Sequence, residues 1–530
     1  MSTAERALNR RTFLAAAAGT GAAVQAAAAP ARAAAPAPAP DVRVRPAAVD
    51  DPTEATVAEA LTLLRRRRFS ATELVQAHLE RIERFDGVYR AFNAVTAESA
   101  LARAAEVDAR RDVRRPLSGI PLCVKDNYWT AGVPTTANST IFADFVPDAD
   151  ATAVARLTAA GGIVVGKGQM GPLATTRATT PAGEVTTVNA WTPDDPAVDP
   201  GGSSTGPATA VAGRLATSSI GTQTGGSITG PSLQQNLTGL KPTMGRTSIA
   251  GIIPLSFTRD HSGPLARDAM DAAIVTSVLA GPDPADPRTL GLPPVPDLVA
   301  AATPVRDRRG GVRLRRRTRI GVPPDWFDGV GPEVAVARQG FLDRVGALRG
   351  ATIVDVTYPA DWELLTGPFN AIRLSERTEP FRHWLRRDLT LFGVSSLTWL
   401  QGLLLSGDEW ITGQRAKTWL LQELYAGLFE QCDVVLQTSP VPFDILGLPE
   451  IAFPLGEAPA YEGGPAAPVG AVLGGQPYEE DRLLEVAAAH QAITDFHLRR
   501  PADPDVSGVQ LRSAAAPLRL DAVQVAAAAQ

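Results

Sequence analysis

Residues 199–248 read DPGGSSTGPATAVAGRLATSSIGTQTGGSITGPSLQQNLTGLKPTMGRTS, and they decide the fold and chemistry that we expect for this chain. They hold two glycine–serine loops, at residues 201–206 and 225–227, on either side of a segment of small residues. Paired glycines allow positive φ angles and can turn several backbone N–H groups towards one point. A serine beside such donors has what acyl transfer needs, a nucleophile next to an oxyanion hole. Either loop alone would more simply be a flexible turn, but two loops around a packed segment favour a site.

The motifs around these loops resemble those of the amidase signature family. The chain reads Gly-Gly-Ser-Ser from residue 201, Gly-Thr-Gln-Thr-Gly-Gly-Ser-Ile from 221 and Gly-Leu-Lys-Pro-Thr-Met-Gly-Arg from 239. Residues 119–127, GIPLCVKDN, look like the lysine motif of that family, and Pro-Thr-Thr follows at 134–136. The likeness extends from about residue 53 to residue 501. It implies the fold of that family, an α/β fold in which a single large mixed β-sheet is covered by helices on both faces.

Composition is consistent with a large globular enzyme. Of 530 residues, 45% are hydrophobic, which is enough to bury a large core. The formal charge of −5 gives no support for nucleic-acid binding. The two cysteines, Cys123 and Cys432, cannot form a disulfide framework. A single bridge is the alternative, but Cys123 lies in an apolar run, which favours a buried free thiol.

The N-terminus looks like a twin-arginine export signal. Arg10 and Arg11 precede an Ala/Gly-rich run, and residues 31–33, Ala-Arg-Ala, offer a cleavage site. A membrane helix is the alternative, but such a run is weakly hydrophobic for a permanent anchor, so we expect no stable membrane insertion. We therefore expect a secreted or periplasmic protein. The expected divisions are a signal peptide at 1–33, an Ala/Pro-rich linker at 34–50, the amidase signature catalytic domain at 51–510 and a C-terminal tail at 511–530.

Helical and strand-like segments alternate along the chain, which is typical of an α/β sheet covered on both faces. A capping box at residues 70–73 predicts the start of a helix. The apolar run 120–124 predicts a strand with Lys125 at its end. Further strands are expected at 162–166, 252–255, 319–322, 352–356 and 433–436, and further helices at 97–111, 208–216 and 479–500, the last of them amphipathic.

Two later tracts bear on possible binding sites. The arginine-rich tract 306–319 invites a phosphate-binding interpretation, but it adjoins an expected strand, and an exposed loop and strand edge is favoured. Residues 324–426 are helical in pattern and rich in Trp and Leu, and their likeness to the family is weakest. We expect this segment to form part of the acyl-group pocket.

The sequence argues against the commoner hydrolase machineries. A Ser–His–Asp site needs a histidine base, yet no G-x-S-x-G elbow is present, and His78, His490 and His497 fall on expected helices. His261 follows Asp260 in a loop of the signature region and could line the site. No H-E-x-x-H motif or Cys/His pair has the spacing of metal ligands, so neither a metal nor a cofactor is expected.

By resemblance, lysine takes the place of histidine as the base. An ordinary lysine, with a pKa of about 10.4, is protonated at neutral pH, so the base would have to be desolvated. The alternative for Lys125 is an interior ion pair. The resemblance assigns Lys125 as base, Ser203 as the bridging serine on a cis peptide, Ser227 as nucleophile, Ser204 as its supporting neighbour, and the N–H groups of Thr224, Gly225, Gly226 and Ser227 as the oxyanion hole.

The chain also departs from the pattern of the family. Gln223 stands where an Asp is usual and Thr229 where an Arg is usual. These two usually oppose each other in charge, and their joint loss avoids stranding one buried ion. Thr205 and Pro207 replace a Gly and a small residue after GGSS, and Gly-Pro at 171–172 replaces a more polar pair. These changes put substrate identity in doubt.

The sequence thus predicts an exported amidase that hydrolyses a carboxamide through a Ser227 acyl-enzyme. An ester or carbamate hydrolase with the same residues, or a catalytically silent family member, is the alternative. The glutaminase subunit of a tRNA amidotransferase shares the signature, but the export signal argues against it. The expected substrate is a small-molecule or peptide amide, and a homodimer is one possible assembly.

Overall fold

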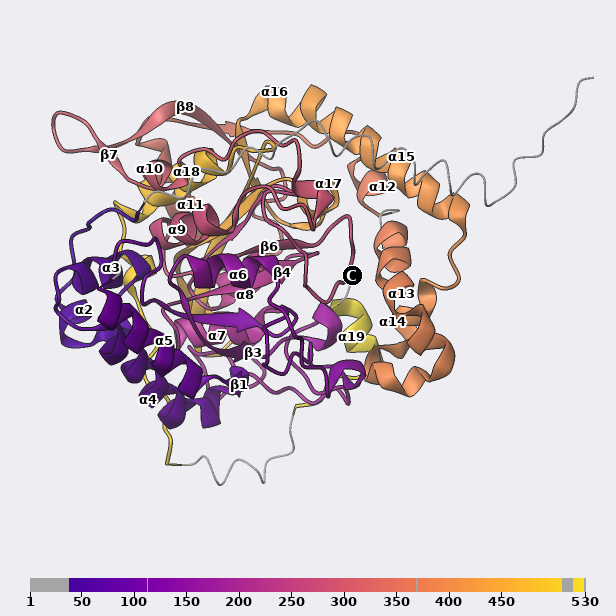
Figure 1. Cartoon of the computed structure of the whole chain (residues 1–530). Helices are drawn as coiled ribbons and strands as arrows, with labels where there is room; N and C mark the ends of the chain where they lie inside the picture. Colours follow the sequence, from indigo (N-terminus) through magenta and orange to yellow (C-terminus); the bar gives the residue numbers. More distant parts are fainter. Residues whose placement is uncertain (1–37, 112, 368–369, 508–517, 529–530) are drawn as a thin grey trace, which may run out of the picture. The chain divides into compact units, whose positions relative to one another are not determined.

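A single mixed β-sheet of twelve strands organises residues 38–111, 113–367, 370–507 and 518–528, the part of the chain that this computed structural model describes (Figure 1). The strands are β1 (Phe92–Val95), β2 (Pro121–Lys125), β3 (Ile163–Gly168), β4 (Ser218–Gln223), β5 (Thr238–Lys241), β6 (His261–Ala266), β7 (Val305–Arg306), β8 (Val312–Val322), β9 (Arg349–Asp355), β10 (Val434–Gln437), β11 (Glu450–Pro459) and β12 (Ala466–Gly475). Their order is β1-β3-β2-β4-β6-β5-β11-β12-β10-β8-β7, with β9 paired to β8. The predicted fold class is confirmed.

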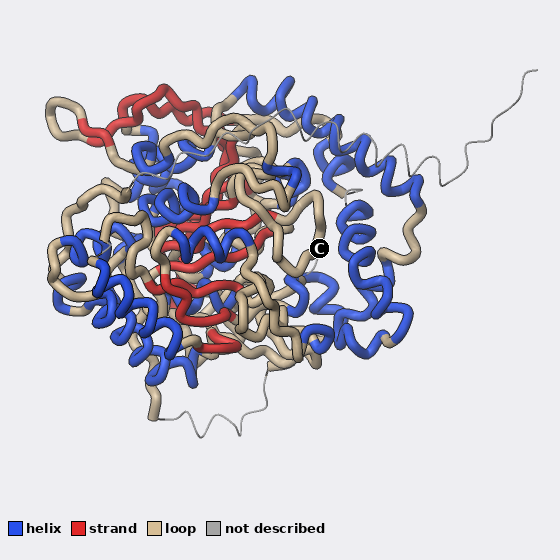
Figure 2. The backbone as a smooth tube through the Cα atoms, in the orientation of Figure 1, coloured by secondary structure: helices blue, strands red, loops and turns tan. Residues whose placement is uncertain are grey.

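Parallel and antiparallel pairs are mixed across this sheet. Strand β2 runs parallel to both β3 and β4, whereas β6 is antiparallel to β4 and β5. Every residue of β2, β4, β5 and β6 is buried, so this part of the sheet is covered on both faces. Figure 2 shows the strands as a red band with helices around it.

The helices connect and cover the strands. They are α2 (Ala47–Asp50), α3 (Val57–Arg65), α4 (Ala71–Tyr89), α5 (Ala97–Arg110), α6 (Thr152–Ala159), α7 (Thr205–Ala212), α8 (Thr229–Gln234), α9 (Ala269–Leu279), α10 (Leu298–Ala301), α11 (Pro332–Gly346), α12 (Trp362–Thr366), α13 (Asn370–Arg387), α14 (Ser396–Gln401), α15 (Gly407–Glu423), α16 (Phe429–Gln431), α17 (Val441–Leu446), α18 (Glu480–Gln491) and α19 (Ala522–Ala528). Helix α7 contacts β2, β3 and β4, and helix α9 contacts β5 and β6. These contacts fix the carboxyl ends of the central strands, where the site lies.

Several local predictions are confirmed in detail. Helix α4 begins with the capping box, in which Ser70 accepts from the Glu73 N–H and the Glu73 carboxylate accepts from the Ser70 N–H. Strand β2 ends at Lys125. The two cysteines, Cys123 and Cys432, are free and buried.

Two element predictions are wrong. Residues 252–255 form no strand: Ile252 makes only an isolated bridge with Tyr128, and Pro254 has no N–H to extend a ladder. The helix expected at 479–500 ends at residue 491, and it is not amphipathic, because nearly all of α18 is buried against α9, α10, α11 and neighbouring strands. Even Glu480 and Glu485 are buried, because Glu480 accepts hydrogen bonds from residues 243 and 246 and Glu485 pairs with Arg316.

The two ends of the unit are more closely packed than composition predicts. Residues 38–50 pack on α3, where Arg45 forms an ion pair with the buried Glu59, so the linker prediction fails for this part. At the other end Leu518 and Leu520 form backbone hydrogen bonds with residues 183–185, and Val525 of α19 is buried. The second half of the predicted C-terminal tail therefore packs onto the rest of the described chain.

The predicted signal peptide, residues 1–33, lies outside the described residues, so export stays a prediction. Within the described ranges, no helix has both the length and the apolar character needed to cross a membrane.

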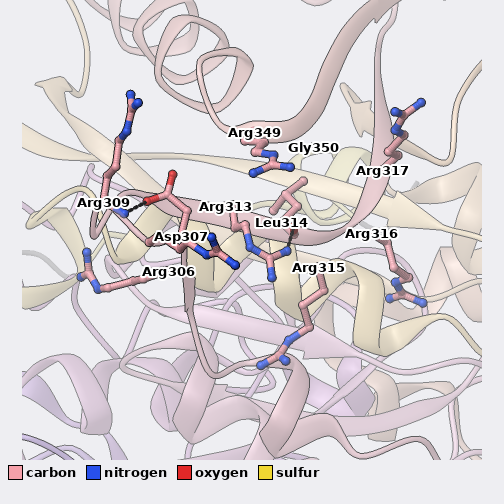
Figure 3. Close-up of a pocket in the computed structure, with 11 residues that line it drawn as sticks. Arg306, Asp307, Arg309, Arg313, Leu314, Arg315, Arg316, Arg317, Arg349 and Gly350 are labelled. Atoms are coloured by element: carbon pink, nitrogen blue, oxygen red, sulfur yellow. Dashed lines mark hydrogen bonds between the residues drawn. The ribbon is translucent and has the colours of Figure 1, made fainter.

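The loop of the arginine-rich tract is exposed, as expected, but the strand that follows is not an edge, because β8 pairs with β10 as well as with β7 and β9. Strands β7 and β8 pair there, and a hollow of about 1,050 Å³ is lined by eight arginines with Asp307, Leu314 and Gly350 (Figure 3). The labelled arginine side chains point in different directions (Figure 3). Several have protein partners: Arg315 donates to the Ala300 and Thr303 carbonyls, and Arg316 pairs with Asp481. Because the lining holds no nucleophile, this hollow is not a candidate for acyl transfer.

Candidate active site

Lys125 lies where two parallel strands end side by side. Val124 of β2 is in register with Ile220 of β4, which brings Lys125 level with Gly221 and within reach of the neighbouring Thr222. The Lys125 Nζ atom lies 2.8 Å from Ser203 Oγ, 2.9 Å from Thr222 Oγ1 and 3.2 Å from the Thr222 carbonyl oxygen. All three partners are uncharged. The strand predicted from residues 120–124 therefore delivers its lysine to the predicted bridging serine.

The surroundings of Lys125 fit a neutral amine. Its side chain is fully buried, and burial lowers the pKa of Lys125 well below its usual range, although the Asp260 carboxylate acts in the opposite direction. A neutral amine has two N–H donors and one lone pair. The Thr222 carbonyl can only accept a hydrogen bond, whereas the hydroxyl of Ser203 can donate one to the lone pair. The three partner atoms thus match the two N–H donors and the one lone pair of a neutral Lys125 amine.

The interior ion pair that was the alternative role for Lys125 is formed by a different lysine. Lys167 of β3 forms the buried ion pair, with its Nζ 3.3 Å from Asp126 Oδ1. It also donates to the Tyr128 carbonyl and to Thr135 Oγ1, both at 2.7 Å. Asp126 in turn accepts from the N–H and hydroxyl of Thr136, which ties down the loop after β2.

The loop that carries Ser203 is held by backbone contacts. The peptide bond between Gly202 and Ser203 is cis, as the resemblance implies. The Gly171 N–H donates to the Ser203 carbonyl at 3.2 Å. A side chain at Gly171 would begin 1.9 Å from the Thr176 carbonyl oxygen, so the Gly at this departure from the family pattern is required by space. Ser204 donates to the Thr222 carbonyl at 3.3 Å, which joins the loop to β4.

The two predicted catalytic serines open onto one cavity of about 270 Å³. Its lining is Ala174, Thr175, Thr176, Arg177, Asp199, Gly202, Ser203, Thr224, Gly225, Ser227, Leu255, Arg373 and Arg377. Ser227 is 8% exposed. No hydrogen bond joins Ser203 to Ser227 within the described residues, so the structure brings the three predicted residues together but connects only Lys125 and Ser203 directly. Catalytic hydrogen bonds are often incomplete without substrate.

The predicted oxyanion hole is available in part. The Gly226 N–H donates to Asp444 Oδ2 at 2.9 Å, so this donor is occupied, contrary to the prediction. In the part of the chain that is described, no protein acceptor takes the N–H groups of Thr224, Gly225 or Ser227. The Thr224 hydroxyl donates to Asp260, which fixes this residue at the cavity wall. Three of the four predicted donors therefore remain for a substrate oxygen.

Gln223 is built into a buried polar cluster behind the nucleophile loop. Its Nε2 donates to Asp444 Oδ1 at 3.0 Å and to Glu450 Oε2 at 2.8 Å, and its Oε1 accepts from the N–H groups of Ile228 and Thr229. Lys241 pairs with both carboxyl groups. Burial raises the pKa of Glu450 to about 8, and the negative charge of Asp444 acts in the same direction.

This cluster explains the joint departure at positions 223 and 229. Two carboxyl groups already share one lysine, so the neutral amide of Gln223 supplies donors that a third carboxylate could not. Thr229 needs no charge because its N–H and hydroxyl both donate to Gln223. Asp444 and Glu450 lie more than 200 residues away in sequence, so the residues around Gln223 could not signal that these acids contact it.

Two further predictions concern the edges of the site. His261 does not line the cavity: it is buried, and its Nδ1 lies 2.6 Å from the Arg259 carbonyl. Burial lowers the pKa of His261 well below its usual value, with Lys241 acting in the same direction. The expectation that residues 324–426 contribute to the pocket is met by Arg373 and Arg377 of α13, which sequence reasoning did not single out. Their four-residue spacing on one helix face was the available signal.

Comparison with known proteins agrees with this site. A family model described as Amidase matches residues 73–440. The chain belongs to the amidase family. It is 34% identical over 497 residues to a glutamyl-tRNA(Gln) amidotransferase subunit from Chloroflexus aggregans, covering 84% of this chain and 98% of that protein. It is 35% identical over 499 residues to the protein of the same name from Myxococcus xanthus, covering 84% and 99%.

A solved structure supports the same assignment. The native peptide amidase from Stenotrophomonas maltophilia superposes with a TM-score of 0.70 at 29% identity, covering 86% of this chain and 99% of that one. As a member of the amidase family, the protein is an enzyme that acts on carbon–nitrogen amide bonds. The family match contains Lys125, Ser203 and Ser227 but ends before Asp444 and Glu450.

Proposed function

We propose that this enzyme hydrolyses a carboxamide through an acyl-enzyme on Ser227, with Lys125 as the base and Ser203 as the proton relay. The observation that carries the proposal is the 2.8 Å contact between Lys125 Nζ and Ser203 Oγ, beside a cavity that Ser227 also lines. Deep burial without a carboxylate partner in contact favours the neutral amine that a base requires.

The proposed reaction moves one proton along two hydroxyls. Lys125 takes the proton of Ser203 while Ser203 takes that of Ser227, and Ser227 Oγ bonds to the substrate carbonyl carbon. The N–H groups of Thr224, Gly225 and Ser227 stabilise the oxyanion. The C–N bond then breaks, and the leaving amine receives the proton back through Ser203. Water repeats the sequence to release the acid and restore Ser227.

The relay needs one adjustment when substrate binds. Ser227 Oγ must come within hydrogen-bond distance of Ser203 Oγ, about 2.7–2.8 Å. Both residues line the same cavity, so no rearrangement of the sheet is needed to bring the two hydroxyls together.

The test of this proposal is Ser227→Ala in an assay of amide hydrolysis. The variant is expected to lose at least about 1,000-fold in kcat/KM while keeping its thermal midpoint, because the Ser227 hydroxyl forms no hydrogen bond with the described residues that would support the fold. Ser277→Ala, a serine on α9 away from the cavity, is the matched control and should keep full activity. Activity of the Ser227 variant at the level of the control would disprove the assignment.

Export through the twin-arginine route is part of the proposal and rests on residues 1–33. Replacing Arg10 and Arg11 by Lys is expected to retain the protein inside the cell that makes it, whereas the unchanged chain is found outside the cytoplasm. Equal distribution of the two forms would overturn this part.

A second candidate function, as one component of an amidotransferase, is favoured by the 34% identity to proteins of that name. It predicts glutamine hydrolysis that is strong only with partner proteins present. An ester or carbamate substrate remains a further alternative. A panel of amides, esters and carbamates with the purified chain alone separates these cases: hydrolysis of simple amides without partners supports the first proposal.

A further inference from the structure

Arg373 lies in the wall of the catalytic cavity with no partner in the described part of the chain. It belongs to α13 and is 7% exposed. None of the described residues forms a hydrogen bond or an ion pair with its guanidinium group, and its Nε is fully buried without an acceptor. An isolated buried charge is costly, and proteins keep one only where something pairs with it.

A second such guanidinium lies beside it. A side chain on Gly225 would begin 3.9 Å from Arg373 Nη1 and 4.0 Å from Arg259 Nη2, so the two cationic groups flank the nucleophile loop. Nε and Nη1 of Arg259 are also buried without acceptors among the described residues. Burial lowers the pKa of Arg373 to about 9, with Arg259 and Arg377 acting in the same direction and Asp444 acting against them. Arg373 therefore still carries its charge at neutral pH.

The nearby acids are occupied elsewhere. Asp444, whose charge acts on Arg373 without forming an ion pair with it, accepts from Gln223 and from the Gly226 N–H and pairs with Lys241. Glu376, three residues further along α13, accepts from the Ser256 and Thr258 hydroxyls. Asp260 accepts from Thr224 and from the N–H groups of residues 255 and 256. Glu376 and Asp260 hold the turn after residue 254, and none of the three carboxylates forms an ion pair with Arg373 within the described structure.

The other cavity arginines differ from Arg373 because part of each guanidinium group has a partner, although the Nε atom of each is also buried without a hydrogen-bond acceptor among the described residues. Arg377 donates to the Thr398 carbonyl and lies over the ring of Trp399. Arg177 pairs with Asp199 at 3.7 Å. Two guanidinium groups that have no partner among the described residues, those of Arg373 and Arg259, therefore place positive charge next to Gly225, two residues before the proposed nucleophile.

We propose that the substrate is a small amide carrying a free carboxylate, which pairs with Arg373 while the amide carbonyl lies at Ser227. The inference rests on the proposed function, since it names the substrate class of the same site. A guanidinium group binds a carboxylate with two parallel hydrogen bonds, which neutral amides cannot provide. The cavity of about 270 Å³ is at the small end of ligand sites, so the substrate is short.

The first test compares succinamic acid, which carries a carboxylate, with butyramide, its neutral analogue of equal chain length, by ammonia release. The wild-type enzyme is expected to prefer succinamic acid, and Arg373→Leu is expected to lower the ratio of the two kcat/KM values about 100-fold. Arg373→Lys should recover part of the ratio, because it restores charge without the two-pronged geometry. Arg386→Leu, an exposed arginine of the same helix, is the matched control and should leave the ratio unchanged.

The second test is independent of the catalytic assignment. In the Ser227→Ala background, succinate is expected to raise the thermal midpoint by several degrees, and butyramide is not. The shift should disappear in the Ser227→Ala, Arg373→Leu double variant. Arg373→Leu alone should be at least as stable as the wild type, because it removes an unpaired buried charge.

Failure of the two proposals can be distinguished. Activity retained by Ser227→Ala would disprove the acyl-enzyme but would not affect the binding test. Equal shifts with succinate and butyramide, no shift with succinate, or a succinate shift that survives Arg373→Leu would overturn the carboxylate site.

Discussion

Gln223→Glu tests whether the buried cluster behind the nucleophile loop tolerates a third carboxyl group. The substitution preserves shape and exchanges the amide NH₂ for oxygen. That NH₂ lies 3.0 Å from Asp444 Oδ1 and 2.8 Å from Glu450 Oε2, so two hydrogen bonds become contacts between acids. Lys241 is the only cation that pairs with either acid in the described structure.

The size of the effect follows from two competing responses. If the introduced carboxyl group stayed ionised, its repulsion from Asp444 at about 3 Å would cost about 5 kcal/mol at an effective dielectric constant of about 20. If it took up a proton instead, holding a group of ordinary pKa about 4.3 neutral at pH 7 would cost about 4 kcal/mol. Protonation is the less unfavourable response. We therefore expect a loss of about 4 kcal/mol in unfolding free energy at pH 7, a large share of a typical total.

The loss of unfolding free energy in Gln223→Glu is also expected to depend on pH. The folded-state pKa of the introduced carboxyl group is expected to be raised above its unfolded value, so the penalty is largest above that folded-state pKa. It should shrink by about 1.4 kcal/mol per pH unit between pH 7 and about pH 4.3, as the unfolded chain also becomes protonated. Urea unfolding of the wild type and the variant at pH 7, 6 and 5 measures the difference between their unfolding free energies. The contribution of Glu450, which titrates in both chains, cancels in this difference.

A matched control isolates the repulsion between carboxylates. Gln235 is equally buried, but its Nε2 donates to the neutral Thr209 hydroxyl, so Gln235→Glu should have a smaller penalty. If Gln223→Glu is as stable as wild type at pH 7, or its penalty does not change with pH, the description of this cluster is wrong.

Two further variants test the site itself. Lys125→Arg keeps a positive charge that proteins cannot remove, so it is expected to lower kcat/KM for amides at least about 1,000-fold; near-normal activity would show that no neutral amine is needed. Gly171→Ala places a methyl group 1.9 Å from the Thr176 carbonyl oxygen and is expected to displace the Ser203 loop, with loss of activity and a lower thermal midpoint. A fully active Gly171 variant with an unchanged midpoint would contradict the packing described around that loop.

Local sequence signals were sufficient to predict where Lys125, Ser203 and Ser227 lie. The run 120–124 is short, apolar and partly β-branched, and it becomes β2 with Lys125 at its end. The glycine–serine loops carry their chemistry in consecutive residues, so the positions of Ser203 and Ser227 could be read from spacing and resemblance.

Contacts between residues that are far apart in the sequence could not be predicted from such local signals. The amide of Gln223 depends on Asp444 and Glu450, which only the pairing of β5 with β11 brings near. Arg373 reaches the cavity because α13 packs Phe381 into an aromatic cluster with Phe142 and Trp399, and helix patterning cannot show which arginine that packing leaves unpaired.

The most direct test of the account is the pH dependence of covalent labelling of Ser227 by a small fluorophosphonate, located by peptide mass spectrometry. The account predicts a single label on Ser227. Its rate should rise with pH through a midpoint well below that of an ordinary lysine, because burial lowers the pKa of Lys125 and only its neutral form accepts the proton. Lys125→Met should remove this pH dependence and slow labelling at least about 1,000-fold. A label on another residue, or a Ser227 rate unaffected by Lys125→Met, would contradict the account.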